Sequence, residues 1–300
     1  MKRKASTAFS HGIRVSGSGR KARAPALRKP RSRPGSTARG AAEASQSPFP
    51  GFPRPTAAEV ARLHAALARR FGARHPDPAG RPKRQILDTV VGTILSQNTT
   101  NTNSHRAFQQ LKRKFGTWDA VRTARPTAVQ AAIKCGGLAP KKTKWIQHIL
   151  RTIRKEHGKT SLEYLRQETK EGVHSELERF EGIGKKTSAI INLFDVRHPD
   201  MAVDTHIFRY AVQLGWVPTE GERAAHNRRG LGKRWPVVTR DTAYLHLDAC
   251  MPDKLKYSMH LLLTDTVGGL PVHCGAGNEL SFDGGVVRVD GKPLQRPAQA

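Results

Sequence analysis

Hydrophobic residues recur every three to four positions through most of the chain between residues 53 and 268, a spacing typical of helices with one buried face. The first such segment opens with Thr56 and Glu59, which form a capping-box pair, and it continues through Val60, Leu63 and Leu67. Further helices are predicted over residues 85–96, 104–115, 127–135, 143–157, 173–180, 186–194, 205–214, 239–250 and 254–267.

Strict alternation of polar and apolar residues is nearly absent from the sequence. It occurs near residues 286–289, beside Gly284 and Gly285, and predicts a small hairpin within a C-terminal segment of residues 271–300. The fold class is therefore predicted to be all-α, with many short helices joined by short loops.

The first 47 residues show no helical periodicity. They are rich in Arg, Lys, Ser, Gly, Ala and Pro, and Glu43 is their only acid. A segment of this composition cannot bury enough apolar surface to offset the entropy lost on ordering, so we predict a disordered basic tail over residues 1–47. Its basic runs suit nuclear import, an organelle transit peptide or a DNA-binding arm. We expect a nuclear protein, with the mitochondrion or a prokaryotic nucleoid as alternatives.

The charge of the chain indicates a polyanionic partner. There are 52 Lys and Arg residues against 24 Asp and Glu residues, which gives a net charge of +28. Nucleic acid is therefore the leading partner class, and an anionic membrane is second. No apolar run is long enough to span a bilayer, so we expect no membrane partner. Cys135, Cys250 and Cys274 form no disulfide or metal-binding pattern, and we expect no metal site.

The strongest chemical pattern runs from residue 176 to residue 194. Gly182 and Gly184 allow a sharp turn between two predicted helices, and the second helix begins with unpaired amide groups and a positive dipole end. Such an arrangement binds phosphate, and Lys185 and Lys186 add positive charge at the same place. A tight connection between helices explains the glycines alone, but it does not explain the lysine pair.

A second pattern covers residues 202–209, where Asp204 precedes an amphipathic run through Ile207 and Phe208. Taken alone, Asp204 is best interpreted as the N-cap of a helix, because Asp is favoured at that position.

Together the two patterns resemble the helix-hairpin-helix DNA glycosylase superfamily, and endonuclease III most closely. Its hairpin reads Pro-Gly-Val-Gly-Arg-Lys-Thr-Ala, and residues 181–188 read Glu-Gly-Ile-Gly-Lys-Lys-Thr-Ser, with Glu181 where proline is usual. Its second motif, Val-Asp-Thr-His-Ile-x-Arg, recurs at residues 203–209, and the separation of the two motifs also agrees. The resemblance covers about residues 58–268 and implies a glycosylase domain over residues 53–268.

The resemblance implies that Lys186 is the catalytic nucleophile and Asp204 the catalytic carboxylate. A lysine amine can attack the anomeric carbon of deoxyribose, displace the base and form a Schiff base, after which β-elimination breaks the strand. Asp204 would stabilise the cationic sugar or assist proton transfer. The hairpin residues expected to bind DNA are Gly182, Gly184, Lys185 and Thr187.

Two further segments resemble the family. Residues 94–100 are similar to a segment whose polar amide enters the gap left by the flipped nucleotide, so Gln97 and Asn98 are both candidates. A helix C-cap is the alternative role for Asn98. Residues 137–142 are similar to a loop that carries an apolar wedge, a role for Leu138, while Lys141 and Lys142 would contact phosphates. A buried loop position is the alternative for Leu138.

The sequence departs from the family in two places. Many endonuclease III relatives end in four cysteines that bind a [4Fe–4S] cluster, whereas only Cys274 follows residue 268 here, so no iron–sulfur cofactor is expected. Residues 214–218, Leu-Gly-Trp-Val-Pro, resemble plant 5-methylcytosine glycosylases of the Demeter type.

The resemblance implies a two-lobed fold with the active site in the cleft between the lobes. One lobe is expected over residues 87–215, and the other from residues 53–83 and 216–267. A monomer would bind duplex DNA that holds a damaged base or an abasic site, excise an oxidised pyrimidine and cleave the strand. The alternatives are a 5-methylcytosine or mismatch glycosylase, a non-catalytic helix-hairpin-helix binding protein, and a basic chromatin protein that acts through its tail.

Overall fold

The computed structural model describes residues 47–75, 84–230, 232–267, 280–283, 286–289 and 292–293. The basic tail expected over residues 1–47 lies outside the described residues apart from its last position. No helix in the described part of the chain combines the length and the apolar character needed to cross a membrane.

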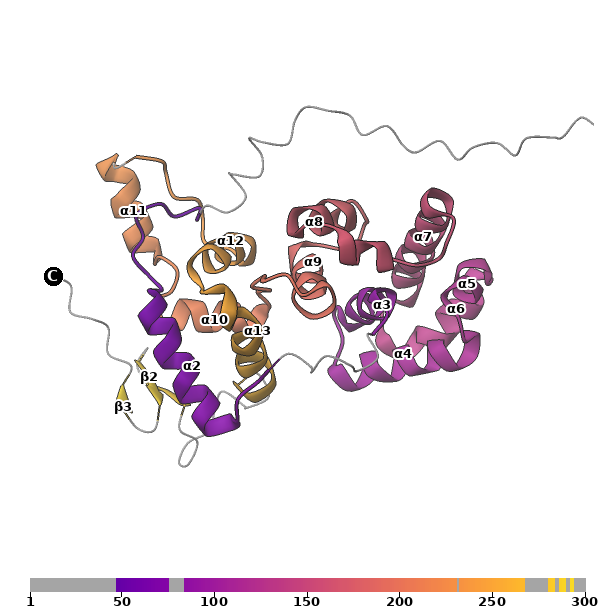
Figure 1. Cartoon of the computed structure of the whole chain (residues 1–300), viewed down its shortest axis with the longest axis horizontal. Helices are drawn as coiled ribbons and strands as arrows, with labels where there is room; N and C mark the ends of the chain where they lie inside the picture. Colours follow the sequence, from indigo (N-terminus) through magenta and orange to yellow (C-terminus); the bar gives the residue numbers. More distant parts are fainter. Residues whose placement is uncertain are drawn as a thin grey trace, which may run out of the picture. The chain divides into compact units, whose positions relative to one another are not determined.

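One group of helices encloses a first hydrophobic core (Figure 1). The group comprises α3 (Ile86–Ser96), α4 (Asn101–Phe115), α5 (Trp118–Thr123), α6 (Pro126–Ile133), α7 (Ala139–His157) and α8 (Lys170–Glu178), with the short 3₁₀ turns η1 (Lys134–Gly136) and η2 (Glu163–Gln167). Helix α3 is apolar on most sides, and seven of its eleven residues are buried. It tolerates this composition because α4, α7 and α9 all pack against it.

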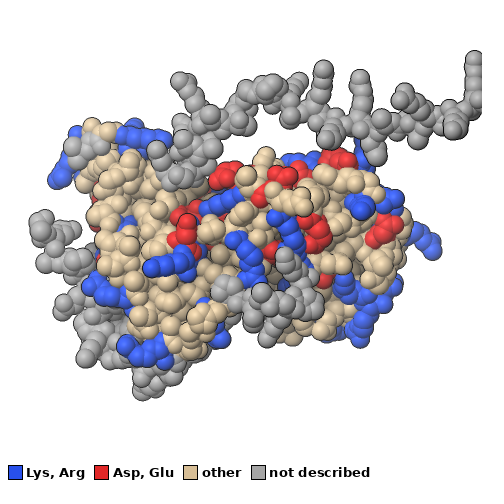
Figure 2. All heavy atoms as spheres, in the orientation of Figure 1, with Lys and Arg blue, Asp and Glu red and all other residues tan. Residues whose placement is uncertain are grey.

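A second core joins the start of the domain to its end. It gathers α2 (Ala57–Phe71), α10 (Thr205–Gln213), α12 (Arg240–Cys250), α13 (Asp253–Leu261) and the π-helical turn η4 (Leu262–Val267). The capping box expected at the start of α2 is present, since Thr56 and Glu59 each accept a hydrogen bond from the other's backbone amide. Helix α11 (Glu220–Arg229) contributes no buried residue, and Lys and Arg side chains gather at its outer end (Figure 2).

Helix α9 (Lys185–Ile191) lies where the two cores meet and continues into the π-helical turn η3 (Asn192–Val196). Its residue Ile191 belongs to the first core, whereas Ala189 belongs to the second. The hairpin formed by α8 and α9 is therefore anchored on both sides by buried apolar contacts.

Three short strands form an antiparallel sheet in the order β1–β2–β3: β1 (Leu280–Asp283), β2 (Val286–Val289) and β3 (Lys292–Pro293). Leu280 pairs with Val289 in the first ladder, and Val289 pairs with Lys292 in the second. The alternating residues 286–289 thus form the central strand.

The predicted all-α architecture with two lobes is confirmed, with corrections to its parts. Helices α4, α7 and α8 begin three or four residues earlier than expected, and α5 and α11 were not predicted. The boundary between the lobes also moves, because Met201, Val203 and Ile207 pack in the second core rather than the first.

Candidate active site and nucleic-acid interface

The turn between α8 and α9 is held from two sides. Gly182 has a φ of +91°, in the left-handed region, and a Cβ atom there would lie 2.6 Å from Cε3 of Trp145. Both the backbone and the close ring contact therefore require glycine. From the other side, the side-chain amide of Gln97 donates a 2.7 Å hydrogen bond to the carbonyl oxygen of Gly182.

The start of α9 offers unpaired hydrogen-bond donors. Gly184 is exposed and extended, and no atom lies within 4 Å of the position that its Cβ would take. The amide groups of Lys185 and Lys186 form the first turn, and they have no acceptor among the described residues. Amides at a helix start with open space before them can bind an anion such as a phosphate.

The two lysines of the hairpin have different environments. Lys185 Nζ lies 3.4 Å from Oε2 of Glu178 on α8, so part of its charge is used within the protein. Lys186 is exposed, and no carboxylate of the described residues pairs with it. The DNA contact expected for Thr187 is corrected, because its side chain is buried and its amide donates to the Gly184 carbonyl at 2.8 Å.

Asp204 caps α10, as its sequence position alone suggested. Its Oδ1 atom accepts a 2.8 Å hydrogen bond from the amide of Ile207, and its Oδ2 atom has no partner in the described part of the chain. The cap fixes the orientation of the side chain at the positive end of the helix dipole, where a negative charge is stabilised. One carboxylate oxygen therefore remains available for a ligand.

The segment that leads to Asp204 is held by α12 and α13. The amide of Met201 donates to Oδ1 of Asp248 at 2.9 Å, and Nδ1 of His260 donates to the carbonyl of Ala202 at 3.0 Å. Both contacts lie within four residues of Asp204, and neither follows from a recognisable motif.

The structure relates the two predicted catalytic residues through one core. Val203, next to Asp204, packs in the same core as Ala189 of α9. Lys186 and Asp204 therefore stand at the first turns of two helices that share buried contacts.

A buried polar network lies behind the hairpin and was not predicted. His174 on α8 places Nδ1 2.7 Å from Oε1 of Glu178 and Nε2 2.7 Å from Oδ2 of Asp200. Ser188 of α9 donates to Glu178 at 2.7 Å, and Tyr244 of α12 donates to Asp200 at 3.0 Å. The only sequence signal was the four-residue spacing of His174 and Glu178, which places them on one helix face.

His174 carries a positive charge in this network. Burial disfavours the charged imidazole, but the hydrogen bonds and charges of Asp200 and Glu178 outweigh it and raise the pKa of His174 to about 9. Burial also disfavours the Glu178 carboxylate, but hydrogen bonds from His174 and Ser188 and the charge of Lys185 lower its pKa to about 2. An imidazolium between two carboxylates thus joins the hairpin to the segment before Asp204.

The two loops expected to enter DNA carry exposed residues with left-handed backbones. Asn98 has a φ of +52°, and Leu138 has a φ of +48° with 48% of its surface exposed. The buried alternative for Leu138 is therefore wrong, and a leucine in this region is strained. The cap of α3 is Gln97 rather than Asn98, and Gln97 is bound to Gly182, so Asn98 is the amide free to reach a ligand.

The neighbouring lysines of α7 do not share one role. Lys141 is exposed, and its Nζ atom lies 4.8 Å from the ring centroid of Trp145. Lys142 is fully buried, and its Nζ atom donates to the carbonyls of Leu95 and Gly136, each at 2.8 Å. The phosphate contact expected for Lys142 is wrong, because none of its surface is accessible.

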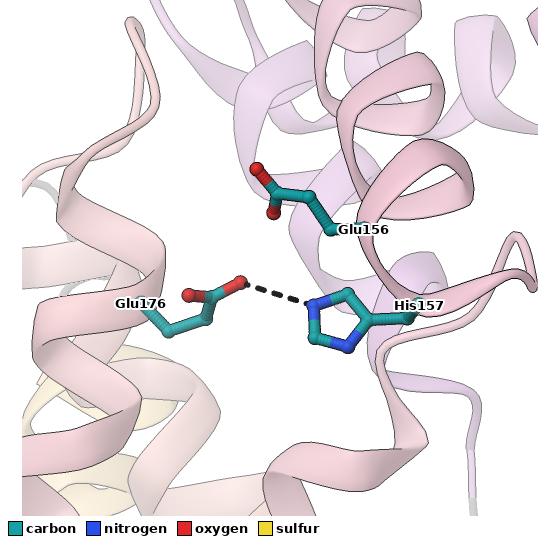
Figure 3. Close-up of side chains that lie close together, drawn as sticks. All are labelled: Glu156, His157 and Glu176. Carbon is teal, nitrogen blue, oxygen red and sulfur yellow. Dashed lines mark ion pairs between the residues drawn. The ribbon is translucent and has the colours of Figure 1, made fainter. Parts of the chain in front are cut away.

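Outside this site, Glu156, His157 and Glu176 lie close together, with potential ligand atoms within 4.8 Å of one another (Figure 3). Arg179 donates to Glu176 at 2.7 Å and also to both carboxylate oxygens of Glu156. The His157 ring stacks on Tyr164 with centroids 4.0 Å apart. Because a guanidinium already neutralises the carboxylates, this cluster is a set of ion pairs rather than a metal site.

A pocket of about 310 Å³ lies between α4, α5 and the end of α7. Neither Lys186 nor Asp204 lines this pocket, so it is separate from the candidate site. The charged residues that line it are Lys112, Asp119, Arg154 and Lys159.

The residues present do not suit a [4Fe–4S] cluster. A [4Fe–4S] cluster needs four thiolate ligands, and the sequence contains three cysteines in total. Burial raises the pKa of the Cys250 thiol, which disfavours the thiolate form that a metal requires.

The described helices combine a hairpin that presents free amides and an exposed lysine with an aspartate that caps a neighbouring helix start. This arrangement defines a helix-hairpin-helix motif with a helix start suited to anion binding. Residues 91–236 match the family described as HhH-GPD superfamily base excision DNA repair protein. The matched segment, residues 91–236, belongs to this superfamily.

Three further comparisons agree with this match. It is 41% identical over 181 residues to an Arabidopsis thaliana protein with the provisional name DNA glycosylase At3g47830, covering 60% of this chain and 56% of that protein. It is 28% identical over 160 residues to endonuclease III of Thermotoga maritima, covering 53% and 68%. A solved endonuclease III–DNA complex superposes with a TM-score of 0.54 at 18% identity, covering 74% and 89%, and shows the shared fold alone.

Proposed function

We propose that this protein is a bifunctional DNA glycosylase of base excision repair, in which Lys186 removes a base and the strand is then cleaved. The observation that supports it best is the exposed, unpaired amine of Lys186 at the first turn of α9, beside amides that can bind the neighbouring phosphate. The match of residues 91–236 to the superfamily supports base excision, and the lysine supports the lyase step.

In the proposed reaction, the Lys186 amine in its neutral form attacks the anomeric carbon, and the base leaves with the bonding electron pair and takes up a proton. The free oxygen of Asp204 stabilises the positive charge that develops on the sugar. The amine then loses its proton and the sugar ring opens to give an iminium. Loss of a proton from the adjacent carbon expels the 3′-phosphate, and water releases the lysine.

A non-catalytic binding protein would use the same amides without needing Lys186 or the free oxygen of Asp204. The test is sodium borohydride trapping on duplex DNA with an abasic site, using wild type, Lys186→Ala and the matched Lys185→Ala variant. We expect a covalent adduct with wild type and Lys185→Ala, and none with Lys186→Ala. A folded wild-type protein that binds the duplex without forming an adduct would exclude the lyase assignment.

For the substrate we propose an oxidised pyrimidine, which rests on the similarity to endonuclease III. The competing substrates are 5-methylcytosine and a mismatched base. Single-turnover excision from duplexes that carry thymine glycol, 5-methylcytosine or a G·T mismatch would separate the three. Preferential release of 5-methylcytosine would show instead that the protein is a 5-methylcytosine glycosylase.

We also propose that the protein acts as a monomer, without an iron–sulfur cluster, in the nucleus. Light scattering and iron analysis of the purified full chain, with localisation of a tagged copy, test these three points. One iron–sulfur cluster per chain would contradict the cofactor proposal.

A further inference from the structure

Lys142 connects two loops that come from different parts of the chain. The Leu95 carbonyl lies in the last turn of α3, and the Gly136 carbonyl ends η1, so neither has the continuing helix that would supply an amide. One Nζ atom donates to both carbonyls at 2.8 Å. The two chain segments are thereby joined by a single buried side chain.

The residues that follow these carbonyls are the exposed ones. Asn98 comes three positions after Leu95, and Leu138 comes two positions after Gly136. The loops also lie side by side, because a Cβ atom on Gly137 would lie 3.9 Å from the Asn98 carbonyl oxygen. Any shift in the Lys142 contacts must therefore move both loop tips relative to each other.

If Lys142 only filled space, a lysine would be energetically unfavourable at this position. Lys142 is fully buried and has no carboxylate partner among the described residues, and burial lowers the pKa of its ammonium. An apolar side chain of similar size would avoid the desolvation of a charge. The two carbonyl contacts are what an apolar residue could not provide.

Helix α7 contains a second buried side chain with the same kind of contacts, which serves as a reference. Gln147 is also buried and donates to the carbonyls of Val121 and Ala124, each at 2.9 Å, where α5 ends. Neither of these carbonyls is closely followed by an exposed residue with a left-handed backbone, as Leu95 and Gly136 are. The two side chains hold different segments of the chain.

We infer that Lys142 is a positioning residue that holds Asn98 and Leu138 together as one unit for insertion into the DNA stack at the extruded nucleotide. This inference rests on the proposed function, since it assumes that these loops enter DNA. Lys142 itself touches no nucleotide.

The test uses a duplex with a tetrahydrofuran abasic analogue and 2-aminopurine opposite it, because β-elimination cannot open this analogue and the fluorescence reports unstacking without catalysis. Wild type, Lys142→Met, Gln147→Met, Leu138→Ala and the Lys142→Met/Leu138→Ala double variant are compared at saturating protein. Borohydride trapping on a single-stranded abasic oligonucleotide is measured in parallel, because it needs Lys186 and no stack to enter.

We expect wild type and Gln147→Met to raise the fluorescence equally, and Lys142→Met and Leu138→Ala to lose most of the increase. On a cleavable duplex, Lys142→Met should slow single-turnover excision by about 10- to 100-fold, as expected for a displaced contact group. Trapping on the single strand should change by less than about twofold. The double variant should be no worse than Leu138→Ala, because both changes remove the same unit.

Full fluorescence with Lys142→Met, an equal loss with Gln147→Met, or additive losses in the double variant would each overturn the inference. No fluorescence increase with wild type would overturn loop insertion, and absent trapping by wild type would instead overturn the proposed lyase. If Lys142→Met does not fold, Lys142→Gln carries the same test, because its donor is shorter by one atom and cannot hold both carbonyls in place.

Discussion

Asp204 uses its two carboxylate oxygens differently, one for the cap of α10 and one left free. Asparagine caps a helix about as well as aspartate, but it carries no charge. Asp204→Asn should therefore keep the stability of the wild type while excision falls by about 10²- to 10⁴-fold. Asp204→Ala should lose activity and also about 1 kcal/mol of unfolding free energy, because the cap is removed.

These changes are measured by urea unfolding together with single-turnover excision of an oxidised pyrimidine, the proposed substrate. If Asp204→Asn excises at the wild-type rate, Asp204 is a cap only, and the carboxylate role must be abandoned.

At the residue scale, the sequence indicates which chemical groups are present but not which way adjacent ones point. Lys141 and Lys142 were assigned the same contact, yet one is exposed and the other is fully buried. Successive residues of a helix differ by about 100° in direction, so a pair cannot share one face. The motifs place Lys186 and Asp204 at helix starts. They do not show which distant side chains hold the hairpin in place, such as Gln97, which binds Gly182 from 85 residues away.

At the scale of the element, replacing the two hairpin glycines should affect different properties, namely stability for Gly182 and DNA binding for Gly184. Gly182→Ala places a methyl group against Trp145 at a left-handed backbone position, so we expect a loss of about 2 kcal/mol or more in unfolding free energy. Gly184→Ala meets no atom, so its unfolding free energy should change by less than about 0.5 kcal/mol.

Gly184→Ala should instead weaken binding to abasic duplex several-fold, because the new methyl group stands before the amides of the α9 start. Urea unfolding and fluorescence anisotropy distinguish the two variants. Normal DNA affinity in Gly184→Ala would contradict phosphate binding at this helix start.

The network around His174 predicts a pH dependence that belongs to the hairpin as a whole. The pKa of His174 rises from 6.5 to about 9 on folding, so the folded protein binds this proton more tightly. The stability it contributes, on the order of 3 kcal/mol, is fully present below pH 6.5 and is lost as the pH rises through 9. The advantage of wild type over His174→Gln should therefore shrink between pH 6.5 and pH 9.

Urea unfolding of both proteins at pH 6, 7, 8, 9 and 10 measures this difference. A difference that stays constant over the whole range would show that the pKa of His174 does not change on folding.

Periodicity identified most of the helices because each buries an apolar stripe, and it failed where that condition does not hold. Helix α11 has no buried residue, so it left no apolar pattern to read. Helix α5 has six residues, which is too short for a repeat. Helix α10 was predicted in the first lobe but packs in the second core. Its amphipathic pattern shows that one face is buried, but it does not show which core that face contacts.

At the scale of the whole molecule, the net charge is divided unevenly along the sequence. Residues 1–46 carry twelve of the 52 Lys and Arg residues and one of the 24 acids, so their removal lowers the net charge from +28 to +17. Both cores and every residue assigned to the chemistry lie within residues 47–267. Charge that supports general attraction to DNA is therefore separable from the groups that support excision.

This separation predicts the result of deleting residues 1–46. Single-turnover excision at saturating protein should stay within about twofold of the full chain, because the deletion removes no residue of either core. Affinity for undamaged duplex should fall, and its dependence on salt should become shallower, because each lost phosphate contact reduces the logarithmic slope by about 0.9. A full chain that shows no excision, and that loses its duplex binding when residues 1–46 are deleted, would instead favour a chromatin protein that acts through its basic tail. Unchanged affinity and slope would show that residues 47–300 supply all of the electrostatic attraction, with the exposed Arg228 and Arg229 of α11 among the next cations to test.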